Sequence, residues 1–309
     1  MKILFMGTPA IAARVLEGLL DAGHEVACVV TKPDRPRDRG KKSAPSEVKT
    51  LALSRGLRVE EPETLKNGAL MPLLEEIAPE MIVVVAYGKI LPESVLNYPP
   101  CGAINVHASL LPRYRGAAPI QRAIMGCEKE TGVTIMRMDK GVDTGDTLLN
   151  AKAAISPEDT AETLTARLAE LSVPLLLEAI GLIERGEAKF RKQNDEFATY
   201  APMIQKEEGF ADWERPAEEI SARIRGLTPW PGCEAELDGV KLKIFAPKLA
   251  GFDPDAAPGT VIAAGKRGLI VACGGGSLLS IGEVQPAGKK RMPSAAYFNG
   301  RPLKENRIR

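Results

Sequence analysis

The chain has 309 residues, which is enough for two domains of ordinary size, about 150 residues each. Apolar residues make up 44%, charged residues 26%, and the net charge is +1, which excludes a collagen-like, a largely disordered and a uniformly basic chain. Two histidines exclude a multi-histidine metal centre, and five cysteines without CxxC spacing favour a reduced, intracellular protein.

The first half alternates continuous apolar runs with amphipathic stretches. We expect strands at residues 2–6, 25–31, 57–60, 80–86 and 101–107, and helices at residues 10–20, 47–55 and 70–77. Strands that are apolar on both faces, separated by helices, indicate a parallel sheet covered on both sides. Ligands bind such sheets beyond the carboxyl ends of the strands, where His107 lies.

The second half has a different pattern, in which a long helix and a charged segment are followed by several short strands. Strands at 131–138 and 146–155 are followed by a long helix over 161–184, and a charged, aperiodic segment predicts a linker at 189–206. Beyond the linker we expect short strands at residues 234–237, 240–245, 260–264, 269–273 and 278–284. The Asp238-Gly239 pair predicts a hairpin, and the close spacing of the strands predicts a small β-barrel. The expected domains are therefore residues 1–188 and 207–309.

Neither a secretion signal nor a membrane span is predicted. The apolar start of the chain ends at Gly7, before it reaches the ~7–15 residues of a signal sequence. The longest strongly apolar run, residues 81–88, falls short of the ~18–20 residues that cross a bilayer. We therefore expect a cytoplasmic protein.

The densest group of chemically useful residues lies between positions 105 and 146. Asn105 and His107 are two apart on a strand, so both side chains leave it on the same face. An acidic, glycine-rich loop with Asp143 follows about 35 residues later. An amide can stabilise a developing oxyanion, an imidazole can move protons near neutral pH, and a carboxylate can orient the imidazole.

Other interpretations of these residues stay open at this point. Asp146 competes with Asp143 for the carboxylate role, and all three side chains can have purely structural roles. Ser109 raises the alternative of a serine hydrolase, although no G-x-S-x-G motif surrounds it. Because G-x-G-x-x-G is also absent, a dehydrogenase is disfavoured.

Two basic stretches stand out from the nearly neutral chain. The loop at 32–42 has four more positive than negative residues, and the tail at 286–309 has six more. A solvated surface explains either stretch alone. Together they favour a nucleic-acid partner that contacts both domains.

The run INVHASLLPRYRGAAPIQ at 104–121, with the loop at 141–146, closely resembles the formyltransferase family that uses 10-formyltetrahydrofolate. Four further segments resemble the members of that family that formylate methionyl-tRNA. These are VVTKPDRPRDRGKK from residue 29, VVVAYGKI at 83–90, TPWP at 228–231 and QPAGKK at 285–290. The resemblance thus covers nearly the whole chain. It implies a Rossmann-like α/β domain followed by an OB-like β-barrel.

The resemblance also implies roles for individual residues. It assigns catalysis to Asn105, His107 and Asp143, and folate binding to the stretch Ser109, Leu110, Leu111 and Pro112. It assigns the approach to the acceptor end of tRNA to the basic loop, here Arg39, Lys41 and Lys42.

The activity that the resemblance implies is transfer of the formyl group of 10-formyltetrahydrofolate to the amine of initiator methionyl-tRNA, for translation initiation. We expect a monomer that needs no metal and no membrane. Two alternatives remain: a formyl-folate enzyme acting on another amine, such as a sugar amine, or releasing formate, and a non-catalytic tRNA-binding module. A non-catalytic tRNA-binding module would not explain why Asn105, His107 and the Asp143 loop are present together.

Overall fold

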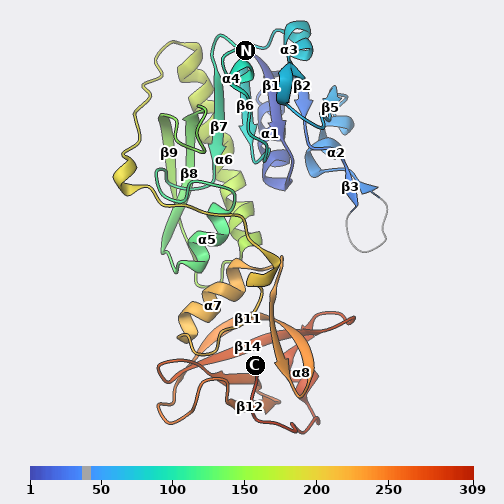
Figure 1. The fold of residues 1–309 in the computed structure, drawn as a ribbon, viewed down its shortest axis with the longest axis vertical. Coiled ribbons are helices and arrows are strands. Elements are labelled where there is room, and N and C mark those ends of the chain that lie inside the picture. The colour runs from blue at the N-terminus through green and yellow to red at the C-terminus, as the bar shows by residue number, and fades with distance from the viewer. Residues whose placement is uncertain (37–42) are drawn as a thin grey trace. The chain divides into compact units, whose positions relative to one another are not determined.

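A computed structural model describes residues 1–36 and 43–309, and the chain forms two compact units (Figure 1). The first unit comprises residues 1–119, 130–154 and 165–202. The second comprises residues 120–129, 155–164 and 203–309. Each unit is described by itself.

A seven-stranded sheet with the order β5-β2-β1-β6-β7-β8-β9 forms the centre of the first unit. Its strands are β1 (Lys2–Gly7), β2 (Glu25–Val30), β5 (Val59–Glu60), β6 (Met81–Val85), β7 (Ala103–His107), β8 (Glu130–Arg137) and β9 (Thr147–Ala154). The first five strands of that order are parallel, as the alternating pattern predicts. β1, β6 and β7 are buried on both faces.

The far end of the sheet differs from the parallel arrangement that we expected, because β8 is antiparallel to β7 and β9 is antiparallel to β8. The connection between β8 and β9, residues 138–146, is shorter than the crossover of a dozen or more residues that a parallel pair requires. Exposed and partly buried residues alternate in the second half of β9, as in a strand with one solvated face. The sheet is therefore mixed.

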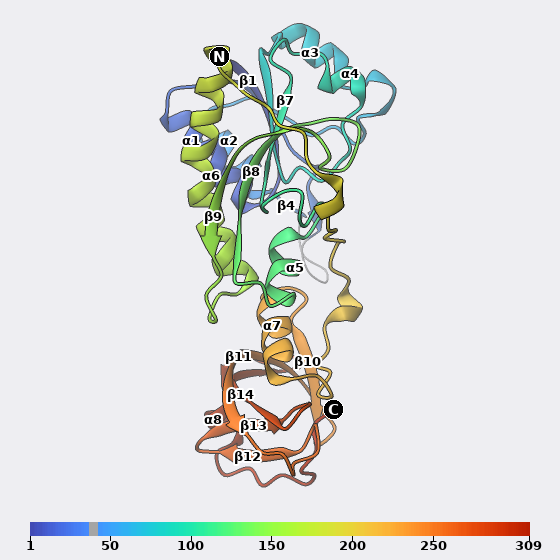
Figure 2. The same cartoon turned by 90° about the vertical axis from the view of Figure 1, so that its left-hand side faces the viewer.

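Helices cover both faces of this sheet (Figure 2). They are α1 (Ala10–Asp21), α2 (Glu47–Ser54), α3 (Met71–Ile77), α4 (Glu93–Leu96) and α6 (Ala161–Glu184). The helix α5 (Pro119–Met125) belongs, apart from its first residue, to the second unit. Side chains of α3 and α4 pack with Leu4, Met6 and Ile82 in one apolar cluster. α1 packs against α6, where a Cβ on Gly18 would collide with Val173. Short elements complete the unit: β3 (Arg35–Pro36), β4 (Ser43–Ala44), and the 3-10 turns η1 (Lys66–Gly68) and η2 (Asp195–Phe197).

The second unit contains an antiparallel sheet with the order β10-β11-β14-β13-β12, with β15 paired to β14. Its strands are β10 (Cys233–Leu237), β11 (Val240–Phe252), β12 (Val261–Gly265), β13 (Gly268–Ala272), β14 (Ser277–Pro286) and β15 (Met292–Pro293). The predicted hairpin is confirmed: Asp238 and Gly239 join β10 to β11 with φ of 53° and 74°. The helices α7 (Ala217–Gly226) and α8 (Ser294–Phe298) and the 3-10 turn η3 (Lys206–Glu208) were not expected from the sequence.

The C-terminal residues join the two edges of this sheet. Ile308 bridges to Leu237 at β10, and Arg307 bridges to Thr260, next to β12. The sheet therefore has no free edge along these bridges, which confirms the expectation of a small barrel-like β domain.

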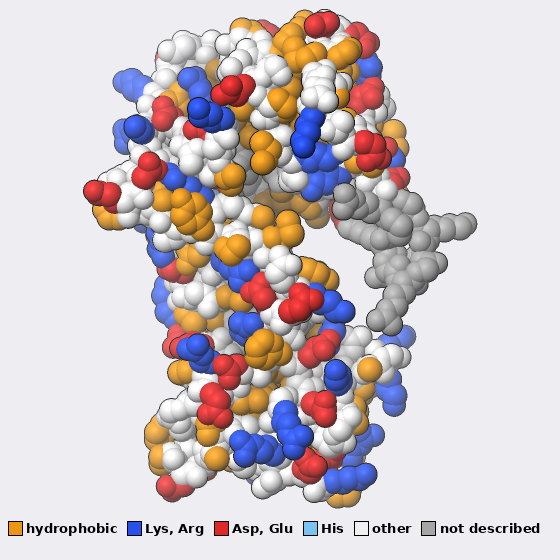
Figure 3. Space-filling model, in the orientation of Figure 1, with side chains coloured by type: hydrophobic (Ala, Val, Ile, Leu, Met, Phe, Trp, Pro, Cys, Tyr) orange, Lys and Arg blue, Asp and Glu red, His pale blue; other side chains and the backbone are white. Residues whose placement is uncertain are grey.

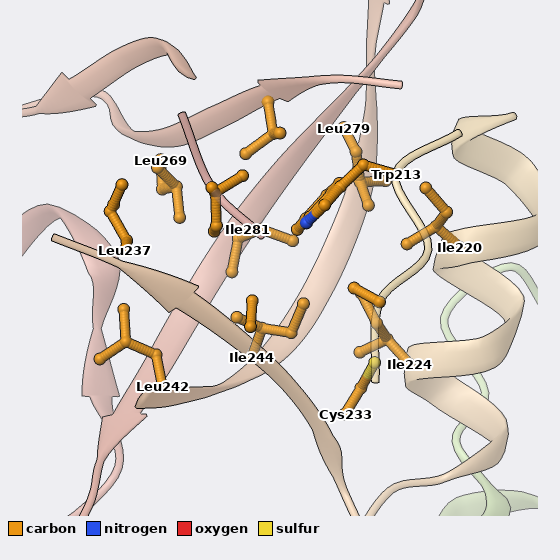
Figure 4. Close-up of a cluster of buried hydrophobic side chains, with 14 of the residues drawn as sticks. Trp213, Ile220, Ile224, Cys233, Leu237, Leu242, Ile244, Leu269, Leu279 and Ile281 are labelled. Atoms are coloured by element: carbon orange, nitrogen blue, oxygen red, sulfur yellow. The ribbon is translucent and has the colours of Figure 1, made fainter. Parts of the chain in front are cut away.

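The core of the second unit is apolar (Figure 4). Trp213 and the α7 residues Ile220 and Ile224 pack against Ile244 and Ile281 from β11 and β14. α7 carries acidic residues in its first turn and arginines in its last, which suits the helix dipole. Burial of its apolar face is the main contribution that holds this helix to the sheet.

The surface carries both signs of charge. Lys and Arg side chains are interspersed with Asp and Glu on the face in Figure 3. The longest helix, α6, has 24 residues, yet neither it nor any other helix among the described residues has the apolar stretch that a membrane span requires.

Candidate active site

Asn105 and His107 lie at the carboxyl end of β7, an interior strand of the first sheet. β7 pairs with β6 on one side and β8 on the other, which fixes the register of both residues. Their side chains are almost buried, with exposed fractions of 9% and 5%. The expectation that both leave the same face is confirmed, because both contact the same carboxylate.

That carboxylate is Asp143, from the loop between β8 and β9. Asn105 Nδ2 donates a hydrogen bond to Asp143 Oδ1 at 3.3 Å, and the Gly116 N–H donates to Oδ2 at 2.8 Å. His107 Nδ1 lies 3.6 Å from the same Oδ2. Asp143 adopts the left-handed region with φ of 54°, where Asp is found more often than most residues. The tertiary structure therefore brings the three predicted catalytic side chains together.

The imidazole of His107 faces an oxygen with each ring nitrogen. Nε2 lies 3.0 Å from the Tyr114 carbonyl oxygen, which can only accept, so Nε2 donates. Nδ1 faces the Asp143 carboxylate at 3.6 Å, which is too long for a hydrogen bond. Nδ1 can therefore turn to a substrate atom nearby, as an acceptor in the neutral ring and as a donor in the protonated ring.

The loop after β7 contains the residues expected to bind folate. Leu110, Leu111 and Pro112 are partly exposed, so they can offer apolar surface to a ligand. Ser109 is fully buried, and its hydroxyl donates to the Arg113 carbonyl at 2.6 Å. The structure thus places Ser109 inside the loop, where it supports the three residues that follow.

This geometry bears on two questions that the sequence left open. The side chain of Asp146 is exposed, and it is Asp143 that contacts both Asn105 and His107. The Ser109 hydroxyl is directed to a backbone carbonyl and not to His107, so a serine nucleophile paired with this histidine is not formed.

The sequence analysis missed two buried side chains beside the Asp143 loop. Gln193, 7% exposed, donates to the carbonyls of Asp143 at 2.8 Å and Gly145 at 2.7 Å. Arg115, 2% exposed, donates to Gln193 Oε1 from Nε and from Nη2, at 3.1 and 2.8 Å. Arg115 is part of the formyltransferase-like run at 104–121, so its sequence context could have pointed to it. Gln193 lies in a charged stretch in which no local pattern distinguishes it.

The residues expected to approach tRNA, Arg39, Lys41 and Lys42, lie outside the described residues. Within residues 1–36 and 43–309, no group of three or more His, Cys, Asp or Glu side chains is arranged to hold a metal ion.

The chemistry that this arrangement can perform follows from its donors. An amide retains two hydrogens on Nδ2, of which Asn105 uses one on Asp143, so the other can meet an oxyanion. The imidazole and carboxylate can hold and move a proton beside it. A buried amide, imidazole and carboxylate at a strand end suit acyl transfer to a nucleophile.

Comparisons with known proteins agree with this geometry. Residues 1–180 match the family described as formyl transferase, and residues 203–302 match the formyl transferase C-terminal domain. The chain is 48% identical to the methionyl-tRNA formyltransferase of Caldanaerobacter subterraneus subsp. tengcongensis, over 100% of this chain and 99% of that protein.

Solved structures share the fold. The sugar 3N-formyl transferase WlaRD superposes with a TM-score of 0.69 at 22% identity, over 94% of this chain and 99% of that one. HypX from Aquifex aeolicus, solved with tetrahydrofolic acid, superposes with a TM-score of 0.66 at 19% identity over 96% of this chain, which spans about half the length of HypX (46%). With both family matches and a near full-length relative at almost half identity, the chain belongs to the formyl transferase family.

Proposed function

We propose that this protein transfers the formyl group of 10-formyltetrahydrofolate to the α-amine of methionine on initiator methionyl-tRNA, in the cytoplasm. The observation that carries the proposal is the shared carboxylate of Asp143, which contacts Asn105, His107 and the Gly116 N–H in a chain that aligns end to end with methionyl-tRNA formyltransferases. Both the donor and the acceptor enter as substrates.

The reaction needs one bond made and one broken. The uncharged amine attacks the formyl carbon, the new C–N bond forms, and the carbonyl oxygen becomes an oxyanion. Collapse of this tetrahedral intermediate breaks the bond between the formyl carbon and the folate nitrogen. One proton leaves the attacking amine and one arrives on the folate nitrogen, so the net step is a formyl-for-proton exchange.

In this proposal each of the three side chains has a separate task. The free hydrogen of Asn105 Nδ2 and the Nδ1 proton of His107 stabilise the oxyanion. Asp143 holds both donors in place and balances the charge of the imidazolium. Their burial strengthens these interactions, because few waters compete for the same hydrogens.

The two substrates are proposed to meet at the end of β7. Leu110, Leu111 and Pro112 would pack against the folate, since apolar surface with a few placed polar groups is typical of small-molecule sites. The basic loop with Arg39, Lys41 and Lys42 would approach the acceptor end of the tRNA. Residues 1–188 then form the catalytic domain, and residues 207–309 a tRNA-binding domain joined by the linker at 189–206.

The test is a formyl-transfer assay with 10-formyltetrahydrofolate and three acceptors: charged initiator tRNA, charged elongator methionine tRNA, and a nucleotide-linked amino sugar. We expect formylation of the initiator tRNA alone. Formylation of the amino sugar instead would replace the acceptor and keep the catalytic residues. No release of the formyl group from folate with any acceptor would contradict the proposed reaction.

A further inference from the structure

Gln193 lies in a charged segment that no local sequence pattern connects with catalysis. The segment 190–201 runs along the loops that carry the candidate active site. Thr147 and Arg191 exchange two backbone hydrogen bonds at the start of β9, and the Thr199 hydroxyl accepts from the N–H of Tyr114. Gln193 lies between these two attachment points.

The side-chain amide of Gln193 makes four hydrogen bonds in a nearly buried position. Its Nε2 donates both hydrogens, one to the carbonyl of Asp143 and one to the carbonyl of Gly145. Its Oε1 accepts both from Arg115, which is itself more deeply buried. Every donor and acceptor position of the amide is therefore in use, which fixes the plane of the side chain.

The loop that Gln193 holds follows a restricted backbone path. Asp143 has a positive φ, and a Cβ on either Gly141 or Gly145 would collide with neighbouring atoms, so the loop follows a path that few sequences can adopt. A residue in a sparsely populated conformation persists only where its surroundings determine it. Gln193 supplies this restraint at the backbone of the residue whose carboxylate contacts Asn105 and His107.

We infer that Gln193 is a positioning residue, which holds the Asp143 carboxylate in register with Asn105 and His107. Gln193 does not contact the reacting atoms in this arrangement. The inference rests on the proposed function, because the effect is read in formyl transfer. Arg115 supports the same task by fixing the amide from the opposite side.

Two substitutions separate the restraint from simple packing. In Gln193→Glu the shape and the contact with Arg115 remain, but both donors are lost and an acceptor faces two carbonyls. In Gln193→Met the volume remains, and all four hydrogen bonds are lost. The matched control is Asn194→Asp, the same amide-to-acid change one residue later on the exposed surface. Asp keeps the acceptor that caps the Glu196 N–H, and it loses only the exposed 3.4 Å hydrogen bond from Asn194 Nδ2 to the Glu196 carboxylate.

The experiment measures kcat and KM for formyl transfer, tetrahydrofolate binding, and thermal unfolding for each variant. We expect kcat to fall about 10- to 100-fold in both Gln193 variants, because a displacement of a catalytic group by about 1 Å can lower the rate by about 100-fold. Folate binding should stay within threefold, and Asn194→Asp should match the wild type. A kcat within twofold of the wild type in Gln193→Glu would overturn the inference, and this variant is decisive if Gln193→Met fails to fold.

A double-variant cycle distinguishes positioning from general destabilisation. If Gln193 acts through Asp143, adding Gln193→Glu to Asp143→Asn should cause no further loss in single-turnover rate. Losses that multiply would contradict the inference while leaving formyl transfer itself intact. Because the wild type is assayed in parallel, failure of the proposed function appears separately, as an inactive wild type.

Discussion

The two units differ in the buried side chains that matter most for their properties. In the first unit, buried polar side chains gather around the end of β7, and each is held by a specific partner. They are Asn105, His107, Ser109, Arg115, Thr134 and Gln193. In the second unit the main core cluster consists of apolar side chains and two thiols. Unpaired polar groups are costly to bury, so the first arrangement tolerates little change and the second tolerates conservative substitution.

The buried thiols behave as apolar side chains in both units. Burial raises the pKa of Cys233 and of Cys273 in the second unit to about 12, and that of Cys28 in the first unit to about 11, so all three remain protonated. Around the end of β7, by contrast, burial serves to direct hydrogens and charges at one point. Substitutions that remove such a group should therefore affect catalysis, and those in the second core should affect stability.

The largest expected effect comes from removing an oxyanion donor. Asn105→Ala and His107→Ala should each lower kcat by about 10²–10³, because each removes a donor that acts mainly in the transition state. Thermal unfolding should change little in comparison. A loss under tenfold in steady-state formyl transfer would contradict the role assigned to that residue.

A backbone substitution should affect both properties of the first unit. A Cβ at Gly116 would lie 2.7 Å from the Ala201 carbonyl oxygen, and the φ of 121° disfavours any side chain there. Gly116→Ala should cost about 1–3 kcal/mol of folding stability. It should also lower kcat about tenfold or more, since its N–H holds Asp143.

Denaturant unfolding and kcat, measured on the same preparation, check this substitution. Gly186→Ala is a control, because its φ is also positive but a Cβ there meets no neighbouring atom. Normal turnover in Gly116→Ala would show that the N–H does not hold the carboxylate.

A conservative change in the second core should affect stability alone. Ile281 is fully buried, and Ile281→Val removes one methylene group, which should lower the free energy of unfolding by about 0.5–1.5 kcal/mol. The kcat at a temperature well below the unfolding transition should equal that of the wild type. A large loss of kcat in this variant would break the contrast between the two units.

The smallest expected effect is a pH dependence in the second unit. Arg122 donates two hydrogen bonds to Glu208, at 2.6 and 2.9 Å, and this holds the pKa of the Glu208 carboxyl below its ordinary value of 4.5. The stabilisation is present above the unfolded-state pKa and is lost as the pH falls below it.

Arg122→Met should therefore lower the free energy of unfolding at pH 7 by up to about 1 kcal/mol, and by less at pH 3.5. Urea unfolding at the two pH values measures the difference. An equal cost at both would show that the ion pair contributes nothing.

The sequence by itself determined much of this protein. Its apolar runs and turn residues predicted the central strands, the helix α6 within its observed bounds, and the hairpin at Asp238-Gly239. The two-residue spacing of Asn105 and His107 placed both on one face of a strand. These features are local, because hydrophobic periodicity and turn conformation depend on residues close together in the chain.

The tertiary structure decided the rest. It placed Asp143, and not Asp146, beside Asn105 and His107, made the end of the sheet antiparallel, and brought Gln193 to a loop 50 residues earlier. None of these follows from local pattern, because each depends on which distant segments share buried hydrogen bonds. A glutamine in a charged stretch looks solvated until the fold buries it against two carbonyls and an arginine.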